Sequence, residues 1–183
     1  MGRRFSSGEG SDKNDERVPN IYEIEVAIAR SEQFNYIKKL VVYNVIGMGS
    51  KLPIWHECDV LVCTKAGYLT EIEIKRSWSD YLNDWKKDHD HSSKMIKYLY
   101  YCVPVKMKDK VLEHLSSLDE SDWRSNAGLL VVDGEPRIYE MKAPQENKGA
   151  VKLSDEQMFY LARLGSMRVV TLKRKMARQQ RGC

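Results

Sequence analysis

The sequence predicts an α/β domain in which a mixed sheet carries helices on its faces. Short apolar and β-branched runs such as VVYNVI, LYYCVP and GLLVVD have the length and composition of buried strands. With the amphipathic segments between them, the order is helix, three strands, helix, strand, helix, strand. Strands that begin as a meander and continue through helical crossovers favour a mixed sheet.

The first half of the chain supplies a helix and three strands. A helix is expected over about 21–39, because isoleucines recur at helical spacing after Asn20, a suitable N-cap. The β-branched run at 41–46 predicts the first strand, and GMGSKLP ends it. Two more strands are expected at 57–63 and 68–75, joined through the turn sequence TKAG.

The second half alternates helices and strands. Ser79 is expected to cap a helix that runs to about Lys87, and Pro104 ends the buried strand LYYCVP. The remaining expected elements are an amphipathic helix at 107–118, a buried strand at 128–133, an edge strand at 137–142, and a helical region from Ser154 that is interrupted near Gly165.

Composition and charge narrow the class of protein. The chain has 183 residues, 42% of them apolar and 31% charged, which suits a folded domain, and no apolar run reaches the roughly 18 residues of a membrane span. We therefore expect a single domain over 20–172, after a disordered leader at 1–19 that lacks the apolar segment of a secretory signal. Four cysteines without paired spacing indicate reduced thiols and a cytoplasmic protein.

The chain ends in a basic tail, residues 173–183, with the sequence KRKMARQQRGC. It holds five Lys or Arg residues and no acidic one, within a chain of net charge +4. Such a tail can contact nucleic acid, or it can serve only to keep the protein soluble.

The register of the central hairpin follows from its turn. Lys65-Ala66-Gly67 fits a three-residue loop, a type I turn followed by a left-handed glycine. Thr64 then pairs with Tyr68, and paired residue numbers sum to 132. This register places Asp59 opposite Glu73, Leu61 opposite Glu71 and Glu57 opposite Lys75.

Two carboxylates that face each other across a hairpin repel, and a divalent cation between them removes the repulsion. Oxygen ligands from Asp59 and Glu73 suit Mg²⁺ or Mn²⁺. Alternating charge is also common on the solvated side of a hairpin. Two observations favour a site: Asp59 directly precedes the apolar run VLVC of its own strand, where an unpaired carboxylate is costly, and Glu25 lies on the apolar stripe of the first helix.

These residues resemble the PD-(D/E)xK nuclease superfamily, which has a helix glutamate, an aspartate on one strand and Glu-x-Lys on the next. Here they are Glu25, Asp59 and Glu73-Ile74-Lys75. The runs KRSWSDYLNDWKKDHDH, KYLYYCVP, AGLLVVD, KAP and LSDEQMFYLARL are similar to an MmcB-like group of DNA-repair nucleases of bacteria and phages. Cys58 departs from the pattern, since it stands where the superfamily name has proline.

The resemblance implies a restriction-endonuclease-like αβββαβ core and metal-dependent hydrolysis of DNA, in repair, recombination or phage DNA processing. Asp59 and Glu73 would bind Mg²⁺ or Mn²⁺ with Glu25 as a further ligand, and Lys75 would position the attacking water or help to deprotonate it. Glu71 would extend the acidic cluster or lie at its rim. The alternative is an inactive module of the same fold that binds nucleic acid or a protein partner.

Other side chains are candidates for binding roles. Lys87 and His91 could share a helical face towards substrate phosphates, although a charged helix surface is also usual. His56, Cys58 and Cys63 suggest zinc, but strand alternation is expected to place His56 and Cys58 on the face opposite Asp59. No organic cofactor is expected.

Overall fold

A computed structural model describes residues 17–46, 51–85, 93–119 and 122–181 of the chain. In order along the chain, its helices and strands are α1 (Ile21–Arg30), β1 (Leu40–Ile46), β2 (Glu57–Cys63), β3 (Leu69–Ile74), α2 (Trp78–Trp85), β4 (Ile96–Pro104), the 3-10 helix η2 (Val105–Met107), α3 (Lys108–Ser117), the 3-10 helix η3 (Trp123–Asn126), β5 (Gly128–Val132), β6 (Ile138–Lys142) and α4 (Asp155–Arg181).

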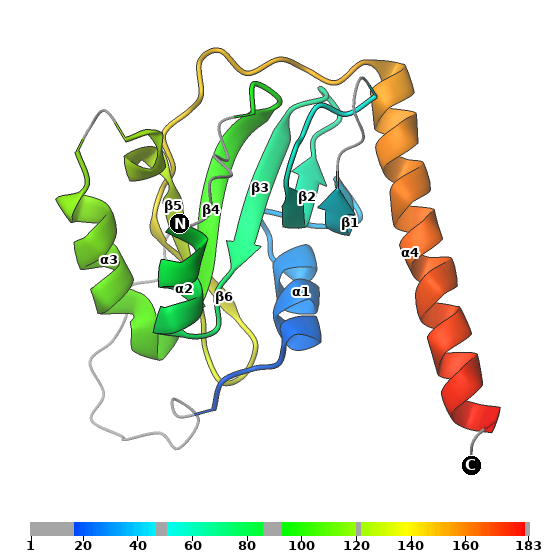
Figure 1. The fold of residues 1–183 in the computed structure, drawn as a ribbon, viewed down its shortest axis with the longest axis horizontal. Helices are drawn as coiled ribbons and strands as arrows, with labels where there is room; N and C mark the ends of the chain where they lie inside the picture. The colour runs from blue at the N-terminus through cyan, green and yellow to red at the C-terminus, as the bar shows by residue number, and fades with distance from the viewer. Residues whose placement is uncertain (1–16, 47–50, 86–92, 120–121, 182–183) are drawn as a thin grey trace.

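The strands form one six-stranded sheet in the order β1-β2-β3-β4-β5-β6 (Figure 1). β1, β2 and β3 pair antiparallel, β4 and β5 are parallel to β3 and to each other, and β6 closes the far edge antiparallel to β5. The connections between the parallel strands contain helices: α2 links β3 to β4, and α3 links β4 to β5. The predicted mixed sheet flanked by helices is therefore confirmed.

Helices cover both faces of this sheet. Ile24 and Ile28 of α1 pack with Ile72 and other residues of one face. α2 and α3 pack on the opposite face, where Tyr81 and Val111 meet the inner side chains of β4 and β5. The Glu71 and Glu73 positions alternate with Ile72 along β3, so they belong to the face that carries α2 and α3.

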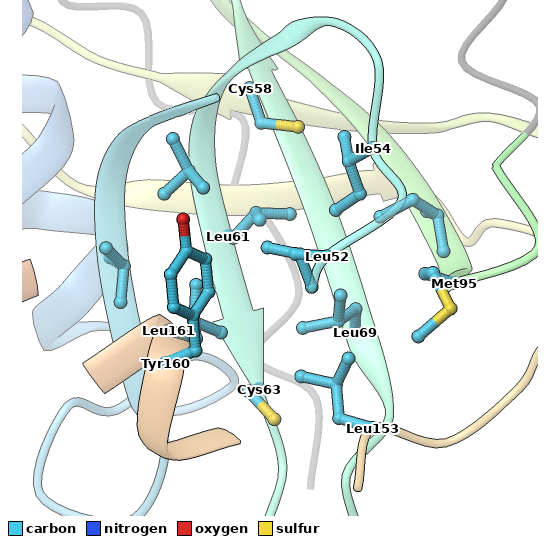
Figure 2. Packing of buried hydrophobic residues seen from close by; sticks show 13 residues of the cluster. Leu52, Ile54, Cys58, Leu61, Cys63, Leu69, Met95, Leu153, Tyr160 and Leu161 are labelled. Atoms are coloured by element: carbon cyan, nitrogen blue, oxygen red, sulfur yellow. The ribbon is translucent and has the colours of Figure 1, made fainter. Parts of the chain in front are cut away.

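A third cluster fills the space between the sheet and α4. Leu61 and Leu69 of the hairpin contact Leu161 of α4 and the loop residues Leu52 and Ile54 (Figure 2). All five are essentially inaccessible to solvent. Burial of each such side chain stabilises the fold by about 1.5–3 kcal/mol, so this cluster holds α4 and the long loops in place.

α1 is shorter than predicted. Asn20 caps it as expected, and Glu23 completes a capping box. The helix ends at Arg30 instead of near residue 39, because Ser31 takes an extended backbone and its N–H bonds the last carbonyls. Phe34 then packs edge-on against Tyr100, with ring centroids 5.5 Å apart, in a turn and not in the helix.

The last helix also differs from its prediction. The expected interruption near Gly165 is absent, and α4 runs through this residue without a break. A Cβ at Gly165 would come within 3.5 Å of the Val42 side chain, so the glycine lies where α4 crosses close to β1. Packing of Leu161 at this crossing outweighs the roughly 1 kcal/mol by which glycine disfavours a helix. The basic segment that starts at Lys173 continues the same helix as far as Arg181.

The hairpin between β2 and β3 has the predicted register. Leu61 pairs with Glu71, and the neighbouring pairs also sum to 132. Gly67 has the left-handed backbone of the expected turn, with φ of +85°. Its carbonyl also accepts a 2.9 Å hydrogen bond from the N–H of Leu153, so the turn anchors the segment that leads into α4.

Gly67→Ala is expected to lower the free energy of unfolding by about 1–2 kcal/mol, measured by urea denaturation. Alanine disfavours a positive φ, and its Cβ would stand 2.8 Å from the Leu153 carbonyl oxygen. Gly149→Ala is the matched control, because its Cβ would meet only the Asn147 side chain at 3.4 Å. Equal stability of the two variants would contradict the structural role given to Gly67.

Among the described residues, no helix combines the length and the apolarity that crossing a membrane requires. Of the expected leader at 1–19, residues 1–16 lie outside the described part of the chain.

Candidate active site

The candidate site lies where the β2–β3 ladder ends. The last residue pair of the ladder is Val60 with Ile72, and beyond it the two strands are joined through side chains. The N–H of Ile74 donates to Asp59 Oδ2 at 2.8 Å, and the N–H of Asp59 is 3.4 Å from Glu73 Oε1. Each carboxylate thus binds the backbone of the other strand, which brings Asp59 and Glu73 together at one point.

Lys75 lies next to this pair and is almost fully buried. Its Nζ donates to Glu73 Oε2 at 2.8 Å and to Asp84 Oδ1 at 2.9 Å. Burial by itself would lower the pKa of Lys75, but the Glu73 and Asp84 carboxylates raise it above its ordinary value. The side chain therefore remains an ammonium group at neutral pH and acts as a hydrogen-bond donor.

Asp84 is a site residue that the sequence analysis missed. It lies on α2, and it is buried although it is charged. Its spacing could have indicated burial, because Asp84 follows Tyr81 by three positions and so shares the helical face that carries this buried aromatic residue. No pattern in the neighbouring sequence identifies Lys75 as the cation that Asp84 contacts.

The electrostatics of Asp59 favour a bound cation. Burial raises the pKa of Asp59, the Ile74 N–H and the charge of Lys75 lower it, and the charges of Asp84 and Asp80 raise it again. The net direction is upward, so its ionised form is disfavoured in the folded protein. A divalent ion beside Asp59 would favour that ionised form.

Glu25 approaches the pair without contacting it. It is buried on α1, and its Oε1 accepts a 3.4 Å hydrogen bond from the side chain of Asn44. Burial raises the pKa of Glu25, and the charge of Asp59 also acts to raise it, against the Asn44 hydrogen bond. Glu25 is thus within electrostatic reach of Asp59, as a further ligand would be.

Glu71 does not join the pair directly. Its Oε1 lies 2.6 Å from His56 Nε2, and His56 Nε2 lies 3.4 Å from Cys58 Sγ. The expectation that His56 and Cys58 point away from the acidic face is therefore wrong. Cys63 does not join His56 and Cys58, because its Sγ is directed to the Thr64 carbonyl.

The physical reason is a break in strand alternation. Asn44 has a left-handed backbone with φ of +51°, and it stands opposite Asp59 in the β1–β2 register. Beyond this point Val45 and Cys58 join the same core cluster as Val42 and Leu61. Residues three apart share a face there, which regular alternation forbids.

Lys87 and His91, the predicted phosphate contacts, lie outside the described residues. Asp59 and Glu73 at the strand ends and Glu25 on α1 each offer carboxylate oxygens, the ligand type that Mg²⁺ and Mn²⁺ prefer. Among the described residues, the carboxylate oxygens of these three do not all lie within 4.8 Å of one another, as the ligand atoms of His56, Cys58 and Glu71 do. Asp59 is only half-buried, so a hydrated ion can reach it.

No protein-family model and no curated protein matches this chain. Among solved structures it is similar to a protein of unknown function from Silicibacter pomeroyi, with a TM-score of 0.54 and 14% sequence identity. The similarity covers 93% of this chain and 95% of that chain. At this identity the comparison shows a shared fold along nearly the whole length, and nothing about activity.

Proposed function

We propose that this chain is a metal-dependent deoxyribonuclease with a restriction-endonuclease-like core. The order α1, β1, β2, β3, α2, β4 supports the αβββαβ arrangement that the sequence resemblance implies. Within it, the helix glutamate, the strand aspartate and the Glu-x-Lys pair lie at the same end of the β2–β3 hairpin.

The observation that carries the proposal is the mutual anchoring of Asp59 and Glu73 beside a buried lysine. A fold that needed only stability would gain little from it, because two neighbouring carboxylates repel and each buried charge is costly to desolvate. An arrangement that costs stability and orients oxygen ligands is typical of a functional site.

The roles of the side chains follow from their positions. Asp59 and Glu73 would hold Mg²⁺ or Mn²⁺, with Glu25 behind them, and the ion would stabilise charge on the scissile phosphate. Lys75 directs two hydrogen bonds to Glu73 and Asp84, and a lysine ammonium has three N–H donors. Its third N–H is suited to orient the attacking water, and its raised pKa favours this donor role over that of a base.

Nucleic acid as substrate is supported by charge. The chain has a pI of about 8.8, and no acidic residue follows Glu156, so the second half of α4 carries only positive charge. Phosphate contacts by such residues are sequence-independent and weaken as salt concentration rises.

The test is a cleavage assay with the purified full-length chain. Labelled single-stranded, duplex and branched DNA are incubated with Mn²⁺, with Mg²⁺ or with EDTA. At least one DNA form is expected to be cut with either metal and none with EDTA. Salt-sensitive DNA binding without cleavage would instead identify an inactive nucleic-acid-binding module, and absence of both binding and cleavage would rule out the proposed substrate.

A further inference from the structure

Three side chains of different chemistry converge beside β2 and β3. The imidazole of His56, the thiol of Cys58 and the carboxylate of Glu71 each direct one ligand atom to a common point, and these atoms lie within 4.8 Å of one another. The exposed fractions of the three residues are 7%, 0% and 0%. They come from two neighbouring strands and from the segment just before β2, so the fold holds them from separate directions.

The spacing matches a tetrahedral metal centre. Zinc binds nitrogen and oxygen at about 2.0–2.2 Å and thiolate at about 2.3 Å, which places neighbouring donor atoms about 3.3–3.8 Å apart. The Cys58 Sγ to His56 Nε2 distance of 3.4 Å already falls in this range. The His56 Nε2 to Glu71 Oε1 distance of 2.6 Å needs to open by less than about 1 Å.

The contacts at His56 Nε2 indicate why a metal suits this point. Both Glu71 Oε1 and Cys58 Sγ approach the same ring nitrogen. Hydrogen bonds can join these groups only pairwise, with the Cys58 thiol also bonded to Glu71, whereas one metal ion accepts an electron pair from all three atoms at once. Thiolate with imidazole selects zinc over Mg²⁺, Ca²⁺ or Mn²⁺.

We propose that His56, Cys58 and Glu71 form a zinc-binding site, separate from the acidic pair at Asp59 and Glu73. Three protein ligands fill three corners of the tetrahedron, which leaves the fourth for a non-protein ligand such as a water molecule, as in other zinc sites with three protein ligands. On binding, the Cys58 thiol gives its proton to solvent and becomes a thiolate. The proposal does not depend on nuclease activity.

The site would also stabilise the framework of the acidic pair. Cys58 precedes Asp59 in β2, and Glu71 precedes Glu73 by two positions on the same face of β3. Cys58 and Leu61 share the core cluster that holds α4 (Figure 2). A metal that ties Cys58 to Glu71 would therefore brace the two strands where their ladder ends.

The test uses cobalt as a spectroscopic probe on chelator-treated, full-length protein. Bound Co²⁺ is expected to give the near-ultraviolet absorption of a cobalt–thiolate bond, and Zn²⁺ to displace it at one ion per chain. Cys58→Ser and His56→Gln are expected to weaken Zn²⁺ binding by about 100-fold or more. Cys63→Ser is the matched control, and Asp59→Asn keeps the site while altering the acidic pair, so both are expected to bind like wild type.

A hydrogen-bonded cluster, with Nε2–H and S–H both directed to Glu71, is the competing arrangement. It predicts no thiolate absorption in wild type, and that result would overturn the proposal. Absorption that persists in Cys58→Ser would assign the thiolate to another cysteine, and loss of binding in Asp59→Asn would assign the metal to the acidic pair. If Cys58→Ser fails to fold, the spectra of wild type, His56→Gln and Cys63→Ser decide the question.

Discussion

Asp59→Asn is expected to lower metal-dependent DNA cleavage by about 100-fold or more while the protein stays folded. The amide removes the charge that a divalent ion needs, yet its oxygen can still accept the 2.8 Å hydrogen bond from the Ile74 N–H. Cleavage rates and melting temperatures with and without Mn²⁺ measure both effects. The metal-induced rise in melting temperature is expected to disappear in this variant.

The same substitution has a pH signature. Since burial raises the pKa of Asp59, ionisation costs stability in the folded chain. This cost is absent below the ordinary aspartate pKa of about 3.9 and is complete above the raised folded pKa. In metal-free buffer, Asp59→Asn is therefore expected to be as stable as wild type in strong acid, and equally or more stable at pH 7.

The control for Asp59→Asn is Asp109→Asn, the same change on a side chain of α3 that is 93% exposed. It is expected to alter neither cleavage nor stability. Unfolding of Asp59→Asn at neutral pH would make Asp59 a structural residue and would contradict its proposed role as a metal ligand.

Lys75→Met is expected to abolish cleavage and to lower the free energy of unfolding by about 3–5 kcal/mol, measured by denaturant titration. Methionine preserves much of the side-chain volume but leaves Glu73 and Asp84 facing each other in the interior. Their side chains are only 4% and 3% exposed, so water cannot readily replace the ammonium group. Lys65→Met, at an exposed position of the hairpin turn, is the matched control.

A second substitution separates stability from chemistry at Lys75. Adding Asp84→Asn to Lys75→Met removes one of the two uncompensated charges and is expected to restore part of the lost stability. Cleavage is expected to stay absent, because the ammonium donor is still missing. Recovery of cleavage in the double variant would show that Lys75 is needed only to keep the site folded.

Much of the fold could be predicted from local sequence. The predicted strand 57–63 has the same bounds as β2. The turn at 65–67 determined the hairpin register, because a left-handed glycine and a loop of known length allow few pairings. The same reasoning brought Asp59 and Glu73 to one place, and helical periodicity put Glu25 on the buried side of α1. Each inference used residues close in sequence, or two strands joined by a short turn.

Local sequence was enough to predict a mixed sheet, its central register and the placing of Asp59 near Glu73 at the end of the hairpin, because turn chemistry and side-chain periodicity act over a few residues. Three features could be seen only in the folded chain: Asp84 contacts Lys75, Asn44 interrupts the alternation beside Asp59, and His56 and Cys58 meet Glu71. Those outcomes depend on packing between elements far apart in the chain, and a left-handed residue on one strand redirects side chains on its neighbour. The alternation of apolar and polar residues within β1 or β2 gives no indication that the side chains change face at this point.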